Sequence, residues 1–233
     1  MSLTGSACLA IWNDVEPARE AEYNVWHTRE HVPERCGVPG ILEARRYIAP
    51  DRDRHRYFTL YDLRDLEVLA SPPYRDLVQR PTPWSAAMRP AFQNFLREPC
   101  EILAAGGIGI GGAAATFRFG LARDAKVSAE AARRLVVSVH ECLTLCAVSL
   151  GAVTAPDAHP LASGIAPEMP VDGPRYLLVA EAAARDALEL EQAEIVRTIT
   201  DSLSATDVTA KIYDLAFVVR HPGSGPRAAG AAG

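Results

Sequence analysis

The sequence lacks the features by which membrane proteins, secreted proteins and nucleic-acid-binding proteins are recognised. No apolar run approaches the roughly 20 residues of a membrane-spanning helix. Residues 1–6 have neither the basic nor the apolar region of a signal peptide, so we expect a cytoplasmic protein. The net charge of −5 argues against a surface that binds nucleic acid through its phosphates. We therefore expect neither a membrane nor a nucleic acid as partner.

The cysteines give no sign of a disulfide framework or a zinc knuckle. They are odd in number and scattered, at Cys8, Cys36, Cys100, Cys142 and Cys146. The chain also has no G-x-S-x-G, P-loop or C-x-x-C motif, so neither a covalent nucleophile nor a phosphate cradle is signalled. What remains is a chain of 233 residues, 48% hydrophobic and 23% charged, which is the composition of a globular protein. We expect no metal and no resident cofactor.

Short apolar runs separated by turn residues predict a β-α-β-β-α-β order in the first part of the chain. This is the ferredoxin-like pattern. The predicted strands are residues 7–12, 41–48, 57–63 and 100–103. The predicted helices are residues 17 to about 32, a short one near 66–69, and 85–96 with a bend near Pro90, the last following a proline-rich loop.

The same order of elements begins again after a glycine-rich stretch, residues 107–112. That stretch matches G-x-G-x-x-G, but strand rather than helix is predicted after it, so we interpret it as a linker. Two short sequence similarities support a duplication of the first part of the chain. Residues 49–51 recur at 155–157, and residues 56–60 resemble 175–179. The predicted strands are 115–119, 147–153, 176–180 and 211–219, the helices 129–145 and 188–203, and an insertion falls in the loop 159–173.

We therefore predict an α+β fold of two tandem ferredoxin-like repeats. The first repeat covers residues 1–106, the linker 107–112, the second repeat 113–220, and a disordered tail 221–233. A ferredoxin-like sheet carries helices on one face only, so its other face must be covered. Two such sheets can cover each other and close into an intrachain dimeric α+β barrel. Pairing of two chains into a homodimer remains open.

Titratable and aromatic residues are densest between residues 22 and 34. On a helix, His27, Glu30 and His31 share one face, and Pro33 is predicted to stop the helix. The H-x-x-E-H pattern is known from zinc peptidases, but no third ligand on a further helix is signalled. A surface charge cluster is the plainer alternative.

The strands carry a second group of candidate residues. Tyr57, Thr59 and Tyr61 alternate and therefore share one sheet face, and Arg45 and Tyr47 share a face of the preceding strand. Such a face could surround a pocket for a small organic molecule. Hydrogen-bonded core residues are an equally good interpretation of the same pattern.

The pattern of Trp26, His31 and Pro33, followed by residues 37–40 and 45–47, resembles the dimeric α+β barrel superfamily, and within it EthD-like and related bacterial proteins. The resemblance covers about residues 7–104. It implies a cavity between sheet and helices that holds a small organic molecule. Similar proteins include cofactor-free monooxygenases, decarboxylases, cyclases and isomerases, haem enzymes, and members without known activity. The second half has His140 without the aromatic residue and proline, so we expect one site per chain.

Three hypotheses follow. In the first, an enzyme without cofactor uses His31 as general acid or base, with Glu30 and His27 assisting. Its substrate would be a small apolar or aromatic compound. In the second, haem or a metal binds through His27 or His31. In the third, the protein binds a ligand without catalysis, for example in a stress response. The residues expected to line the pocket are Trp12, Asn13, Trp26, Arg45, Tyr47, Tyr61 and Trp84.

Overall fold

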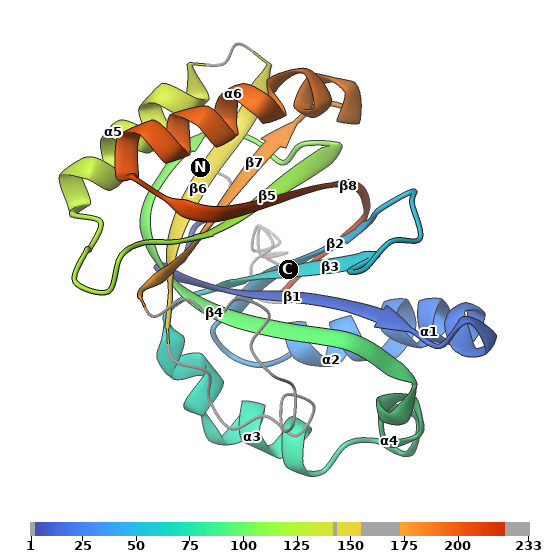
Figure 1. Ribbon diagram of the computed structural model, residues 1–233. Helices are drawn as coiled ribbons and strands as arrows, with labels where there is room; N and C mark the ends of the chain where they lie inside the picture. The colour runs from blue at the N-terminus through green and yellow to red at the C-terminus, as the bar shows by residue number, and fades with distance from the viewer. Residues whose placement is uncertain (1–2, 142–143, 155–172, 222–233) are drawn as a thin grey trace, which may run out of the picture.

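Eight antiparallel strands close into a barrel in the computed structural model, which describes residues 3–141, 144–154 and 173–221 (Figure 1). Their order around the barrel is β1-β3-β2-β8-β5-β7-β6-β4. The predicted α+β fold and the closed barrel are therefore confirmed. The strands are β1 (Ala7–Val15), β2 (Ile41–Ile48), β3 (Tyr57–Leu63), β4 (Phe92–Gly107), β5 (Ala113–Gly120), β6 (Leu145–Val153), β7 (Arg175–Ala182) and β8 (Thr206–Arg220).

The barrel consists of two groups of four strands in the same relative order. The first group, β4-β1-β3-β2, comes from residues 3–107, which we call the first half. The second group, β8-β5-β7-β6, comes from residues 108–221, the second half. The long strands β4 and β8 join the groups, because each pairs along part of its length with its own half and along another part with the other half.

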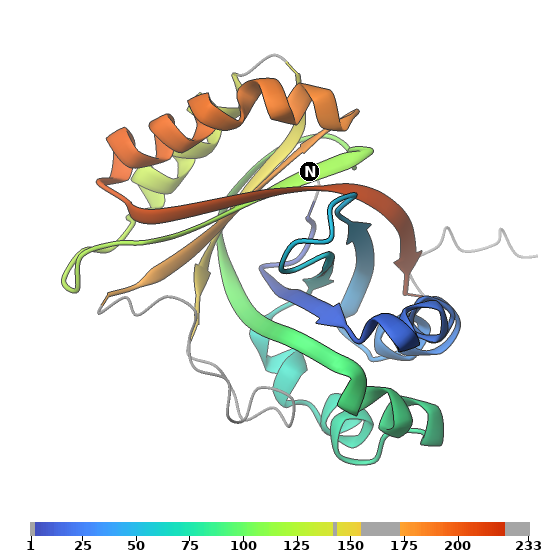
Figure 2. The same ribbon diagram turned by 45° about the vertical axis from the view of Figure 1, so that its right-hand side comes forward.

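Helices cover the barrel on two opposite sides (Figure 2). On one side lie α5 (Ala129–His140) and α6 (Arg185–Leu203), the second-half helix layer. The first-half helix layer, on the other side, consists of shorter pieces: η1 (Pro17–Arg19), α1 (Glu20–Trp26), η2 (His27–His31), α2 (Val32–Cys36), η3 (Leu66–Ala70), α3 (Pro72–Gln79), α4 (Pro83–Met88) and η4 (Arg89–Ala91). No described helix is both long enough and apolar enough to cross a membrane.

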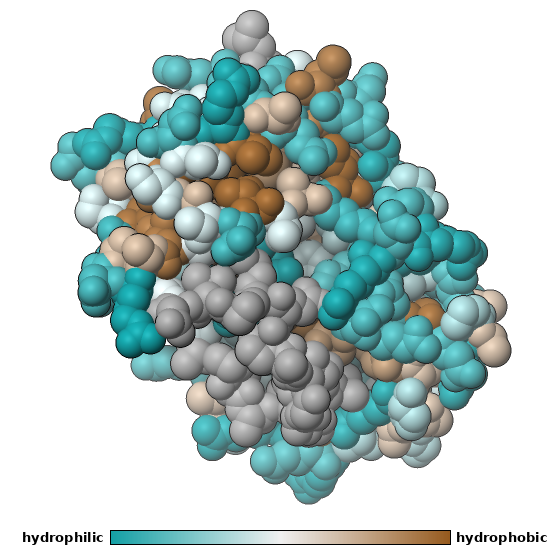
Figure 3. Space-filling view, viewed as in Figure 1, coloured by the Kyte–Doolittle hydropathy of each residue, from teal (hydrophilic) through white to brown (hydrophobic). Residues whose placement is uncertain are grey.

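Aromatic rings and ion pairs fill the barrel interior. Trp12, Tyr47 and Tyr213 all pack around Phe58, with ring centroids 5.1, 5.5 and 5.4 Å from it. The buried arginine Arg45 pairs with Glu181 at 2.5 Å across the barrel. This interior is separate from the two cores that lie between sheet and helices. The surface facing the viewer in Figure 3 is mainly hydrophilic over the described residues, with a group of hydrophobic side chains in the upper half of the view.

Two predicted elements differ from the structure because of proline. Residues 92–96 are the start of β4 rather than helix, since Pro90 ends the helical segment and Phe92 then pairs with Val15 of β1. Pro72 and Pro73 begin helix α3 instead of lying in a loop, because proline is accepted in the first helical turn and Ser71 caps that turn.

Some predictions concern residues outside the described ranges. These are the repeated stretch at 155–157, most of the loop 159–173, Cys142, and the tail beyond His221. The glycine-rich stretch connects strand β4, which ends at Gly107, to strand β5, which begins at Ala113. The element that follows it is thus a strand and not a helix, as the linker interpretation requires.

Candidate functional site

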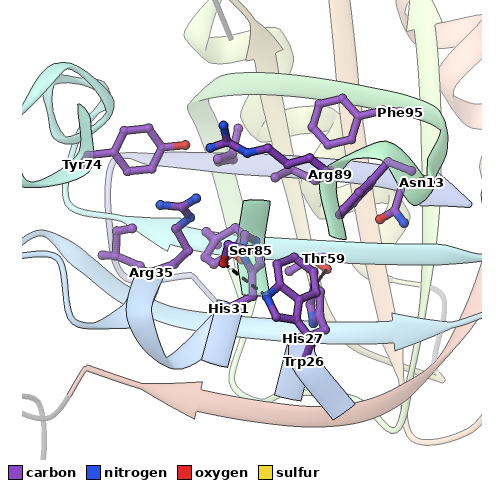
Figure 4. Close-up of a pocket in the computed structure, with 15 residues that line it drawn as sticks. Asn13, Trp26, His27, His31, Arg35, Thr59, Tyr74, Ser85, Arg89 and Phe95 are labelled. Carbon is purple, nitrogen blue, oxygen red and sulfur yellow. Dashed lines mark hydrogen bonds between the residues drawn. The ribbon is translucent and has the colours of Figure 1, made fainter. Parts of the chain in front are cut away.

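A pocket lies between the outer face of the first-half strands and the first-half helix layer (Figure 4). We call it the first-half pocket. Its volume is about 50 Å³. At about 10–15 Å³ for each water molecule, this is room for roughly three to five waters. Its apolar lining is Leu9, Ile11, Trp26, Ile41, Phe92 and Phe95, and its polar lining is Asn13, His27, His31, Arg35, Thr59, Tyr61, Tyr74, Ser85 and Arg89.

Strand alternation explains which side chains reach the pocket. Thr59 and Tyr61 of β3 face it, while Phe58 and Leu60 face the barrel interior. Tyr57 lies on the same face as Thr59 but under α1, where its hydroxyl donates to Glu20 at 2.7 Å. The shared face predicted for these three residues is confirmed.

The helix that carries both histidines continues past Pro33, so the predicted stop is wrong. His27–His31 form a π-helical turn, in which the N–H of Val32 donates to the carbonyl of His27, five residues earlier. A proline in an α-helix clashes with the carbonyl four residues before it, and the wider π-turn relieves that clash. Helix α2 then carries Arg35 one turn beyond His31.

His27 and His31 both line the first-half pocket, with their ring centroids 5.3 Å apart. His27 is 3% exposed, and its Nε2 lies 3.5 Å from the hydroxyl of Thr59. Burial and the charges of Arg46 and His31 hold the pKa of His27 well below its ordinary value of 6.5, so its imidazole is neutral at pH 7. The His31 ring lies 4.5 Å from that of Trp26.

Arg46 supplies one of the two charges that, after burial, lower the pKa of His27. It is 2% exposed and donates to the Asn24 side chain at 2.7 Å. Its guanidinium lies 5.0 Å from the ring centroids of both Tyr23 and Tyr57. These aromatic faces stabilise a cation away from water.

Glu30 faces α4 rather than the pocket. Its carboxylate accepts hydrogen bonds from Trp26 Nε1 at 3.2 Å, Thr82 Oγ1 at 2.6 Å and Ser85 Oγ at 3.1 Å. Glu30 therefore holds α4 against the histidine-bearing helix. Trp84 also lies outside the pocket lining, with its Nε1 donating to Glu22 at 3.0 Å.

The other candidates are divided between two faces of the sheet. Asn13, Trp26 and Tyr61 line the first-half pocket. In contrast, the structure places three candidates in the barrel interior, on the opposite face of the sheet: Trp12, Arg45 and Tyr47. Because Trp12 and Asn13 are neighbours on one strand, alternation already required them to face opposite ways.

Four polar lining residues were not among the sequence candidates: Arg35, Tyr74, Ser85 and Arg89. A signal existed for Arg35, which follows His31 by four residues and so lies next to it on a helix. No comparable signal existed for the others. They come from α3, α4 and η4, and only tertiary packing, in which α3 contacts α2 and α4 contacts α1, brings them to the pocket.

The geometry of the pocket disfavours haem ligation through His27. The Nε2 of His27, a usual ligating atom, faces the Thr59 hydroxyl. For metal ions, the described residues contain no group of three or more His, Cys, Asp or Glu side chains that could hold one.

Comparisons with known proteins show the fold. Neither the protein-family models nor the curated proteins give a match to this chain. Among solved structures, the chain is similar to an anthrone oxidase-like protein, with 9% identity over 95% of this chain and 96% of that chain and a TM-score of 0.61. It is also similar to a candidate monooxygenase from Fusobacterium nucleatum, with 13% identity, coverages of 94% and 96%, and a TM-score of 0.60.

The chain shares the ferredoxin-like α+β barrel fold of these proteins. A haem-binding protein from Thermus thermophilus is a further similar structure, with 11% identity, 92% coverage of both chains and a TM-score of 0.50. At such low identity these likenesses concern the fold, so the chemistry has to be argued from the site.

Proposed function

We propose that the chain is an enzyme that performs cofactor-independent acid/base chemistry in the cytoplasm on a small compound with an apolar or aromatic body. The observation that carries the proposal is a pair of imidazoles, His27 and His31, in a pocket lined by both apolar and polar side chains. Imidazole is the side chain whose ordinary pKa suits proton transfer at neutral pH. The fold shared with an anthrone oxidase-like protein and a candidate monooxygenase supports this class of chemistry.

His31 is the proposed general base or acid. It would take a proton from a carbon next to a carbonyl group, and the electron pair of that C–H bond would move to the carbonyl oxygen. Isomerisation, cyclisation and cofactor-free oxygenation can all begin from the enolate formed in this way, and decarboxylation leads to the same type of anion. The proton returns from the imidazolium when the reaction requires it.

Tyr61 is suited to stabilise the developing oxyanion. Its hydroxyl is buried and has no hydrogen-bond partner among the described residues. Burial raises the pKa of Tyr61, so the hydroxyl stays protonated and can donate. Asn13 is held in place because its side chain accepts from the Tyr23 hydroxyl at 3.1 Å and donates to the Asp14 carbonyl at 3.1 Å. His27, whose imidazole is neutral, would form part of the pocket wall and offer the ligand a polar ring nitrogen.

Replacement of His31 tests the proposal. We expect His31→Ala to reduce turnover, or hydrogen–deuterium exchange of an activated C–H bond, by about 10²–10⁴-fold across a panel of small aromatic ketones and phenols. The matched control is His140→Ala, which removes the histidine at the end of α5 in the second half. Unchanged turnover in His31→Ala would remove His31 from the mechanism.

A non-catalytic ligand-binding protein is the second candidate. It is favoured by the small enclosed volume, which leaves little space for a substrate and a second reactant together. Saturable binding of panel compounds without any turnover or exchange would support this alternative.

We also propose that the chain is a tandem pair of repeats, residues 1–106 and 113–220, joined by residues 107–112. The equal strand order of the two halves supports this interpretation. The closer EthD-like relationship rests on Trp26, His31 and Pro33 of the first repeat. Only this repeat carries that pattern, so the proposed site occurs once per chain.

A further inference from the structure

We propose that the ligand of the first-half pocket is a small organic acid, with its carboxylate bound between Arg35 and Arg89. This inference rests on the proposed site and specifies the class of compound that it takes. Arg35 comes from α2 and Arg89 from η4, and both line the pocket. Figure 4 shows the two guanidinium groups on the same side of the pocket as the Tyr74 hydroxyl, while Asn13 lies on the other side.

Two guanidinium groups contact Tyr74, and that of Arg89 lies near the Tyr74 hydroxyl (Figure 4). That of Arg35 lies 5.6 Å from the centroid of the Tyr74 ring. Arg97 donates to the Tyr74 hydroxyl through Nη2 at 3.2 Å. Arg89 donates to the Val78 carbonyl at 2.5 Å, and burial together with the charge of Arg35 lowers its pKa. This part of the pocket is therefore strongly positive.

None of the described residues that line the pocket carries a carboxylate to balance this charge. Nη1 of Arg35 is buried without a hydrogen-bond partner among the described residues. Glu30 is turned toward α4, and Glu34, next in sequence to Arg35, is not part of the lining. Arg35 is half-buried, and an anion that enters the pocket could accept from the buried Nη1 atom, which otherwise lacks a hydrogen-bond acceptor in the described part of the chain.

The buried arginines Arg45 and Arg118 form ion pairs at short distance, whereas no ion pair of Arg35 is seen among the described residues. Arg45 pairs with Glu43 at 2.7 Å and with Glu181 at 2.5 Å. Arg118 pairs with Glu98 at 3.2 Å. Arg46 has no such acid, but it donates to Asn24 and packs on several aromatic rings. A carboxylate bound in the first-half pocket would form with Arg35 the kind of ion pair that Arg45 and Arg118 form with glutamates.

The shape of the site favours a carboxylate on a small apolar body. The planar guanidinium fork matches the two oxygens of a carboxylate. The lining also includes the apolar side chains of Leu9, Ile11 and Phe95, and His31 lines the same pocket. An acid held by Arg35 and Arg89 would thus present its carbon skeleton to the proposed base.

Matched acids and amides provide the test. Titration calorimetry would compare propionate, benzoate and phenylacetate with propionamide, benzamide and phenylacetamide on the full chain. We expect at least one acid to bind at least tenfold more tightly than its amide. Arg35→Met and Arg89→Met should each abolish that preference, and Arg35→Lys, which keeps the charge but not the fork, should reduce it only in part.

Arg29→Met is the control, because Arg29 is an exposed cation of the same helix and does not line the pocket. It should bind like the wild type, and thermal unfolding would verify that each variant is folded. Equal affinity for acids and amides, no binding of any acid at 10 mM, or an equal loss in Arg29→Met would overturn the inference. So would tighter binding of phenylphosphonate than of benzoate.

The inference and the proposed function can fail separately. If His31→Ala retains the preference for acids but loses turnover, both stand. If it retains both properties, the proposed function fails and the carboxylate site stands. If turnover depends on His31 but neutral substrates bind as well as acids, the carboxylate site fails alone.

Discussion

The two helix layers cover the same barrel, yet they are packed in different ways. Under α5 and α6 the contacts are apolar throughout, and Leu135, Ile195 and Ile199 are at most 1% exposed. Under α1, η2 and α2 the corresponding space holds the buried polar residues His27 and Arg46 and an enclosed pocket.

This difference shows how one architecture can serve two purposes. Apolar side chains pack densely without partners and contribute stability through the area that they bury. Buried polar groups need hydrogen bonds or charges around them, and each group left without a partner costs free energy. The second-half layer thus acts as a core, whereas the first-half layer gives up some packing for a polar pocket.

The largest effect is expected when a side chain in the apolar core under α5 and α6 is shortened. Ile195→Ala removes most of a fully buried side chain, so we expect the free energy of unfolding to fall by about 2–5 kcal/mol. Ligand binding in the first half should stay unchanged once folding is complete. Urea unfolding measures the first quantity and calorimetry the second. Leu190→Ala on the same helix is the control, since Leu190 is 81% exposed and should change stability by less than about 0.5 kcal/mol.

A smaller effect is expected from Glu30, which ties α4 to the histidine-bearing helix. Glu30→Ala removes the acceptor of three hydrogen bonds and should cost about 1.5–3 kcal/mol of unfolding free energy. Because α4 carries Ser85 of the pocket lining, ligand affinity should fall as well. In the control Glu22→Ala the removed carboxylate is exposed, and its interactions with Arg19 and Trp84 are screened by water, so we expect a clearly smaller loss than in Glu30→Ala. Equal losses in both variants would contradict the role given to Glu30.

The smallest expected effect is a pH dependence of stability that belongs to His27. The pKa of His27 is lowered in the folded chain, whereas the unfolded chain takes up this proton near pH 6.5. Below pH 6.5 the unfolded state therefore binds more protons, and stability falls as the pH falls, by up to about 1.4 kcal/mol per pH unit.

Urea unfolding between pH 8 and pH 5 would measure this slope. His27→Gln should flatten it below pH 6.5, while His140→Gln, at the end of α5, should leave it as in the wild type. A wild-type slope in His27→Gln would show that His27 is not the buried neutral group described above.

Much of the barrel could be predicted from local sequence patterns. The predicted strands at residues 41–48 and 57–63 agree with β2 and β3 at both ends, because β-forming residues lie between clear turn signals. The start of β4 was missed, since residues 92–96 are strand only through pairing with β1. The π-helical turn was missed as well, because Pro33 looks like a stop when the helix is assumed to be α-helical throughout.

The candidate site was predictable only in part. His27, His31 and Trp26 lie close together in sequence, and a single helix brings their rings within 6 Å of one another. Arg89 and Tyr74 reach the same pocket from elements that are placed by tertiary contacts. Arg45 and Tyr47 looked equally suitable, but the face of the sheet that their side chains occupy is the barrel interior.

The most direct test of this account is a crystal structure of the full chain with the tightest-binding acid of the calorimetric series. The account predicts density for the ligand in the first-half pocket, with the carboxylate at Arg35 and Arg89 and the carbon skeleton facing His31. Density in the barrel interior beside Arg45, or under α5 and α6 in the second half, would contradict it.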